Sequence, residues 1–348
     1  MLNVGAVIAA VVDNATKNRQ SHASWRIPIS IQFVWAFVIA VGMIFLPESP
    51  RWLIKNGRDE DAARSLSRLT SLPPDHPDVQ AELDEIHLSF EQEKALGEAS
   101  YLDCFRSNNN LTRFRTLTGI FLTALNQLTG ISFIFYYGTV FFMNSGVQNP
   151  FEVQIACTTI LAGMILPGMW GVEKFGRRRL LLVGSACMCV CQFLAGIVGV
   201  TVPTTNPAGS KALVSLACIF IAFYALAWAP VTGVLLSEIF PLNVRAKAMS
   251  LAIASGWAWN FGIGYSVPYM INKEPGSAGL GVKVFFIWGS ACAVCVAFIY
   301  FVIPEVRLGS STFWNFSGLH YFSDQGVVSR ADQPPIPEHH PDAFDLLS

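Results

Sequence analysis

Long stretches without a charged side chain alternate with short charged segments along this chain of 348 residues. A helix needs about 20 apolar residues to cross the hydrocarbon core of a bilayer, and a charge at its centre costs about 2.5–3.5 kcal/mol. Stretches of at least 20 residues without Lys, Arg, Asp or Glu lie at 27–47, 116–151, 153–172, 180–210, 212–237, 248–272 and 284–304. The pattern therefore predicts seven full transmembrane helices.

An eighth charge-free stretch, residues 1–12, is too short for a full span. A helix of this length extends roughly 18 Å, against a hydrocarbon core of roughly 30 Å. A signal peptide would fit the length, but the positively charged segment that should precede its apolar part is absent. We therefore expect the second half of a span, in a chain that begins inside a larger protein.

Residues 47–115 form the longest charged segment, with 13 acidic and nine basic residues. Helical spacing predicts helices at 58–69 and 77–96, and Pro77 suits the first position of a helix. A segment of about 70 residues with this many charges cannot bury a large core. We expect a solvated helical linker and not a separate catalytic domain. With the linker on the cytoplasmic side, 15 Lys and Arg lie inside and six outside, as the positive-inside rule requires.

Composition narrows the possible functions. The chain is 52% hydrophobic and only 14% charged, whereas soluble domains carry about 25% charged residues. A net charge of −1 leaves no basic surface for nucleic acid. The predicted spans contain no His, Asp or Glu, so acid–base catalysis has no candidate there and we predict no enzyme activity. We expect neither a metal site nor a cofactor, because no histidine accompanies the span cysteines Cys187, Cys189, Cys191, Cys292 and Cys295.

Uncharged polar side chains gather in the stretch LNQLTGISFIFYY at 125–137. On a regular helix Asn126, Gln127 and Ser132 would point in three directions, at roughly 0°, 100° and 240°. They can converge only if the helix is broken, and Gly130 is placed to allow a break. A polar solute would then satisfy the buried amides, and hydrogen bonding between helices is the alternative.

Glutamate and arginine recur together where predicted helices leave the membrane. Such residues can form ion pairs that hold the ends of helices together in one conformation and separate in another. Positive-inside topology with helix capping is the alternative, and it explains the arginines but not the glutamates. The residues concerned are Glu48, Arg51, Glu173, Arg177, Arg178, Glu238 and Arg245.

Five motifs occur in order: LPESPRWL at 46–53, NQLTGISFIFYYG at 126–138, EKFGRRR at 173–179, SEIFPLNVRAKAMS at 237–250 and WAWNFGIG at 257–264. Together they resemble the sugar porter family of the major facilitator superfamily, and most nearly its fungal hexose transporters. The resemblance implies an all-α polytopic membrane protein with the major facilitator fold. We expect about seven full transmembrane helices plus one partial helix, without the first four of the family's twelve.

The resemblance also divides the chain. Residues 1–46 would hold the last two helices of the N-terminal half, 47–115 the cytoplasmic linker, and 116–305 the C-terminal six-helix half. Residues 306–348 continue differently from the family and are expected to be a disordered or mispredicted tail.

The family's site residues carry over to this sequence position by position. Gln127 and Asn126 stand at its glutamine pair, Asn260 and Trp257 in its NWxxN segment, and Tyr136 and Tyr137 at its tyrosine pair. The glutamates and arginines named above fall on its cytoplasmic charge network. The resemblance implies transport of monosaccharides of the hexose class by alternating access, as uniport or proton symport. The expected partners are the sugar, protons and the lipid bilayer, and the expected location is the plasma membrane.

Five positions depart from the family pattern, and Asn126 is the mildest, because it replaces the first glutamine of the pair but keeps an amide. Ser132, Leu161 and Gly256 stand where the family has asparagine, and Gly233 stands where it has tryptophan. The groups lost at Ser132, Leu161 and Gly233 would each remove about 1–3 kcal/mol if sugar bound as in the family. Two alternatives to transport follow: a sugar sensor on the same fold that does not transport, or an inactive fragment.

Overall fold

The computed structural model describes residues 2–19, 21–95, 100–106, 112–202, 206–241, 244–271 and 276–303, and within these ranges all regular structure is helical. The all-α prediction is therefore confirmed. The apolar helices are α1 (Leu2–Thr16), α2 (Ala23–Phe45), α6 (Thr112–Leu128), α7 (Ile131–Asn144), α8 (Pro150–Phe175), α9 (Arg177–Thr201), α10 (Pro207–Ile239), α11 (Arg245–Ile271) and α12 (Val284–Val302). The predicted tail, 306–348, lies outside the described residues.

Six helical segments of the described chain are long and apolar enough to cross a membrane, with α6 and α7 counted as one. They correspond to six of the seven predicted spans. The seventh, at 248–272, forms the 27-residue helix α11 but is not among the six. Its glycines, serines and Asn260 lower its hydropathy, which suits a helix that faces polar neighbours. The short first stretch forms α1, with 15 residues.

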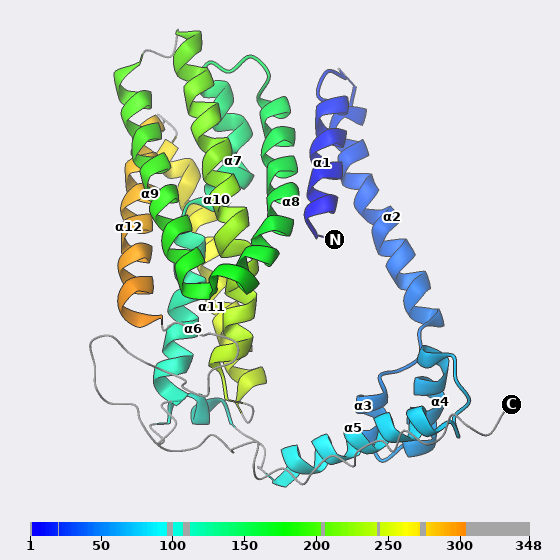
Figure 1. Cartoon of the computed structure of the whole chain (residues 1–348). Coiled ribbons are helices and arrows are strands. Elements are labelled where there is room, and N and C mark those ends of the chain that lie inside the picture. Colours follow the sequence, from blue (N-terminus) through cyan, green and yellow to red (C-terminus); the bar gives the residue numbers. More distant parts are fainter. Residues whose placement is uncertain are drawn as a thin grey trace, which may run out of the picture.

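Helices α6 to α12 form one bundle (Figure 1). Helix α9 packs between α10 and α12, α8 packs on α10, and α11 packs on α6. The core is rich in aromatic side chains, among which Phe133, Trp228 and Phe142 are fully buried. Helix α1 lies against α8, and α2 extends from α1 toward the charged linker (Figure 1).

The linker folds into short helices with a small core of its own. These are α3 (Pro50–Lys55), α4 (Asp59–Thr70), α5 (Pro77–Ala95) and the 3₁₀ turn η1 (Tyr101–Phe105); a second such turn, η2 (Gly281–Lys283), precedes α12. The predicted helices at 58–69 and 77–96 are thus confirmed as α4 and α5. Leu53 and Ile54 of α3, Leu66 of α4, and Val79 and Leu83 of α5 pack together.

The long charge-free stretch at 116–151 is interrupted near its middle. Helix α6 ends at Leu128 and α7 begins at Ile131, with Gly130 between them at φ +88°. Only glycine adopts this left-handed conformation without strain. Trp288 of α12 also lies against this glycine, and a Cβ added there would come within 2.7 Å of its Cγ atom. The predicted break at Gly130 is confirmed.

Gly130→Ala is expected to destabilise the protein. The left-handed conformation costs about 1–2 kcal/mol for a residue with a Cβ, and the overlap with Trp288 adds to it. Thermal unfolding in detergent should show a lower Tm. Gly163→Ala is the matched control, because a Cβ added at this membrane-depth glycine of α8 meets nothing within 4 Å. Equal Tm values for the two variants would contradict the strain argument.

Candidate functional site

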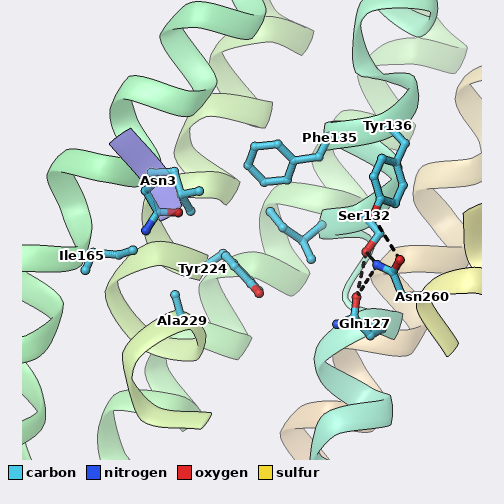
Figure 2. Close-up of a pocket in the computed structure, with 11 residues that line it drawn as sticks. Asn3, Gln127, Ser132, Phe135, Tyr136, Ile165, Tyr224, Ala229 and Asn260 are labelled. Atoms are coloured by element: carbon cyan, nitrogen blue, oxygen red, sulfur yellow. Dashed lines mark hydrogen bonds between the residues drawn. The ribbon is translucent and has the colours of Figure 1, made fainter. Parts of the chain in front are cut away.

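A cavity of about 410 Å³ opens where α1, α6, α7, α8, α10 and α11 come together (Figure 2). This volume is within the range of about 300–1,000 Å³ usual for small-molecule sites. The lining residues are Asn3, Gln127, Ile131, Ser132, Phe135, Tyr136, Leu161, Ile165, Tyr224, Ala229 and Asn260. Every one of these described lining residues is uncharged, so the cavity suits a neutral solute.

Four polar side chains on one wall of the cavity form a hydrogen-bond network (Figure 2). The Asn260 amide Nδ2 donates to Gln127 Oε1 at 3.1 Å and to Ser132 Oγ at 2.9 Å. The Ser132 hydroxyl donates to Gln127 Oε1 at 2.8 Å, and the Tyr136 hydroxyl donates to Asn260 Oδ1 at 3.0 Å. This wall therefore presents amide and hydroxyl groups from α6, α7 and α11.

The break at Gly130 makes this network possible. Gln127 is at the end of α6 and Ser132 is in the first turn of α7, and they would not face each other on one continuous helix. Within the described chain no hydrogen bond occupies the Nε2 group of Gln127, whereas its Oε1 accepts two. Gln127 thus keeps a donor for a ligand in the cavity.

Three of the six residues expected at the substrate lie in the cavity wall: Gln127, Asn260 and Tyr136. Asn126 is 8% exposed and is directed to α10 instead. Its Oδ1 accepts a hydrogen bond from the Tyr224 hydroxyl at 3.2 Å, and its Nδ2 donates to Thr232 Oγ1 at 3.3 Å. Asn126 and Gln127 therefore contact different helices, because about 100° of helix rotation separates adjacent residues.

Tyr137 and Trp257 lie outside the lining of the cavity. The Tyr137 hydroxyl donates to the Gly264 carbonyl at 2.8 Å and ties α7 to α11. Trp257 is 67% exposed on α11. Tyr137 is therefore placed to align the two helices that carry Tyr136 and Asn260.

The departures from the family pattern have different local surroundings. Ser132 takes part in the amide network, and Leu161 contributes an apolar surface to the cavity. A Cβ added at Gly233 meets nothing within 4 Å, so the space beside it is open. A Cβ added at Gly256 would lie 3.3 Å from Thr123 Cβ, which shows close contact between α11 and α6.

Two polar lining residues were not found by sequence reasoning. Asn3 of α1 and Tyr224 of α10 each bring a polar group to the cavity (Figure 2). Asn3 had a signal in the sequence, since it is a polar residue inside the first charge-free stretch. Tyr224 had none, because nothing in the sequence places the middle of α10 opposite Gln127.

Several members of the expected charge network lie at one end of the C-terminal bundle. Arg177, at the start of α9, forms an ion pair with Glu238 near the end of α10, with 2.6 Å between Nη2 and Oε1. The Arg178 guanidinium donates to the Tyr300 carbonyl at 2.7 Å and lies over the Tyr300 ring. Arg245 Nε donates to the Phe240 carbonyl at 3.4 Å.

The other three members lie on neighbouring segments. Glu173 is in the last turn of α8, close in sequence to Arg177. Glu48 precedes α3 and accepts a hydrogen bond from the backbone N–H of Ser49 at 3.1 Å, and Arg51 is in α3 itself. The structure thus pairs Arg177 with Glu238 across two helices and places Glu48 and Arg51 at the linker.

Comparison with known proteins identifies the family. A family model described as "Sugar (and other) transporter" matches residues 1–311. The chain belongs to this sugar transporter family. It is 44% identical over 309 residues to the "Probable glucose transporter rco-3" of Neurospora crassa, covering 87% of this chain and 52% of that protein. It is 37% identical over 308 residues to the "High glucose sensor RGT2" of Saccharomyces cerevisiae, covering 88% and 40%.

A solved structure confirms the major facilitator fold. The fold of this family member matches that of the major facilitator superfamily proton:xylose symporter XylE of E. coli, solved with 6-bromo-6-deoxy-D-glucose, at a TM-score of 0.66 and 23% identity. The match covers 88% of this chain and 62% of that one. Like its curated relatives, XylE is longer, and the chain spans about half the length of the relatives named above. The apolar helices and the fold make the chain an integral membrane protein.

Arg177→Met is expected to lower the stability of the bundle. It leaves the partly buried Glu238 carboxylate without its cation, which should cost about 1–3 kcal/mol because the site is mostly shielded from water. A lower Tm in detergent checks this. Arg113→Met, at an exposed position near the start of α6, is the control and should leave Tm unchanged. An unchanged Tm for Arg177→Met would show that the pair does not hold α9 to α10.

Proposed function

We propose that this chain carries monosaccharides of the hexose class across a membrane by alternating access, with the cavity as the sugar site. The single observation that carries the proposal is the network of Gln127, Ser132, Asn260 and Tyr136 on one cavity wall. Sugar hydroxyls both donate and accept hydrogen bonds, as the amides and hydroxyls of this wall do. The similarity to a probable glucose transporter supports the hexose class, and the similarity to a xylose symporter supports monosaccharides more broadly.

The opposite wall supports a sugar in a different way. Leu161 and Ile165 of α8 and Ala229 of α10 present apolar groups to the cavity. A pyranose ring carries C–H groups as well as hydroxyls, so an apolar surface facing a polar one fits its two kinds of surface. Asn3 of α1 adds a polar group from outside the C-terminal bundle. We therefore assign sugar contact both to α1 and to the helices of the C-terminal bundle that line the cavity.

The proposed role of the ion pair is conformational. Arg177 and Glu238 join the ends of α9 and α10, and we propose that they and the other charged residues at this end hold one of the two alternating states. We further propose that the protein acts in the plasma membrane, as uniporter or proton symporter. Because the described lining residues are uncharged, a coupled proton would have to bind elsewhere.

A sugar sensor is the second candidate, and the similarity to the glucose sensor of S. cerevisiae favours it. Binding and uptake separate the two functions. The purified chain in proteoliposomes should bind radiolabelled D-glucose and should accumulate it in the lumen if it is a carrier. Saturable binding without accumulation supports the sensor. Absence of binding to either D-glucose or D-xylose contradicts both functions and supports an inactive fragment.

Gln127→Leu should weaken D-glucose binding and uptake. It removes one free donor and one acceptor of the network while keeping a similar volume, and lost hydrogen bonds of this kind cost about 1–3 kcal/mol, or roughly 5- to 150-fold in Kd. Gln154→Leu is the matched control, because this amide of α8 lies outside the cavity lining. Equal Kd values for Gln127→Leu and the unmodified chain would remove Gln127 from the site.

A further inference from the structure

The end of α6 lies at membrane depth, where its last carbonyl groups cannot be left without donors. Donors from nearby in the sequence satisfy some of these carbonyl groups. The Thr129 hydroxyl donates to the Asn126 carbonyl at 2.7 Å, and the Gly130 N–H donates to the Gln127 carbonyl at 3.3 Å. The Thr129 carbonyl, at the break itself, takes its donors from other helices.

Gln192 of α9 supplies the strongest of these donors. Its Nε2 donates to the Thr129 carbonyl at 3.3 Å, and its side chain is only 2% exposed. A buried amide is costly unless it is hydrogen-bonded, and this one faces a carbonyl that the break has left open. Gln192 of α9 therefore caps the open carbonyl at the break between α6 and α7.

Helix α12 adds weaker donors and a packing surface. The Cys292 thiol donates to the same Thr129 carbonyl at 3.7 Å, and the Cys295 thiol donates to the Leu125 carbonyl at 3.7 Å. Trp288 packs on Gly130. None of these residues, nor any other described residue of α9 or α12, lines the cavity. The break is thus held by two helices that do not line the cavity.

The held carbonyl lies between the two network residues of the broken helix. Thr129 is two residues after Gln127 and three before Ser132, and these two side chains are joined by a 2.8 Å hydrogen bond. Their relative position depends on the backbone at 128–131, which Gln192 restrains through Thr129. The cap therefore fixes the geometry of the network without touching the cavity.

We propose that Gln192 is a positioning residue of the sugar site: by capping the Thr129 carbonyl it holds Gln127 and Ser132 in the arrangement that receives a sugar hydroxyl. That the ligand is a sugar rests on the proposed function. The capping of the Thr129 carbonyl by Gln192 does not depend on it. A merely structural glutamine would stabilise the bundle and leave Gln127 and Ser132 where they are. The two roles predict different results.

A reporter that needs no sugar gives the first test. Ser132→Cys places a thiol at a position that is 5% exposed, and a membrane-impermeant thiol reagent measures how accessible it is in proteoliposomes. Adding Gln192→Leu should increase the labelling rate about fivefold, because the freed break lets α7 shift away from Gln127. Adding Met188→Leu, a volume-conserving change of a fully buried residue one turn earlier on α9, should leave the rate within about twofold.

A double-mutant cycle gives the second test. Gln192→Leu alone should weaken equilibrium binding of radiolabelled D-glucose about fivefold, and the double variant with Gln127→Leu should lose less binding free energy than the two single losses combined. Such non-additivity indicates that Gln192 acts through Gln127. Additive effects, or an unchanged Kd and an unchanged labelling rate in Gln192→Leu, would overturn the proposal.

The two proposals fail in different ways. If the unmodified chain binds no sugar, the proposed function is wrong and the labelling rates still decide whether Gln192 positions Ser132. If Gln127→Leu weakens binding and Gln192→Leu does not, only the positioning role is wrong. Should Gln192→Leu fail to fold, Cys292→Ala removes the second donor to the same carbonyl, and it should raise the labelling rate about twofold. An unchanged rate in that variant would count against the cap.

Discussion

The requirement that backbone carbonyls be hydrogen-bonded inside a membrane governs the site of this protein. A continuous helix meets that requirement by itself, but it cannot bring Gln127 and Ser132 to the same side. The chain breaks the helix at Gly130 and supplies donors for the freed carbonyls from α9 and α12. The polar wall of the cavity follows from this break, because the end of α6 and the start of α7 can face the same side, which one continuous helix does not allow.

The helices of the bundle consequently divide into two groups. Helices α6, α7, α8, α10 and α11 contribute lining residues, whereas α9 and α12 pack behind the break. The cost of leaving a polar group without a hydrogen bond differs between the two groups of helices. Polar side chains that face a cavity exchange partners between the protein, water and a solute, while those behind the break must keep one partner in a fully buried setting. Gln192 and the cysteines of α12 belong to the second kind.

The Arg177–Glu238 pair shows the same need for a buried polar group to keep its partner, here at the end of the bundle. Arg177 is 7% exposed, so its charge would be costly without the carboxylate 2.6 Å away. A pair of this kind favours one arrangement of α9 and α10 and disfavours arrangements that separate them. It therefore suits a protein that moves between discrete states, and it links the charged end of the bundle to the helix that carries Gln192.

The sequence by itself determined the helices and the position of the break. Stretches without charge are long enough to span a membrane, and Gly130 in a polar run has no role in a regular helix, so both features follow from local physical rules. The motifs that resemble a family also named Gln127 and Asn260 as residues of one site, but not their hydrogen bond to each other.

Only the tertiary structure decided which way each polar side chain faces. Asn126 contacts α10 and its neighbour Gln127 contacts α11, Asn3 reaches the cavity, and Gln192 caps a carbonyl 63 positions away in sequence. Membrane helices are apolar around most of their circumference, so periodicity does not tell the cavity side from the lipid side. That side is set by the neighbouring helices, and no local pattern specifies them.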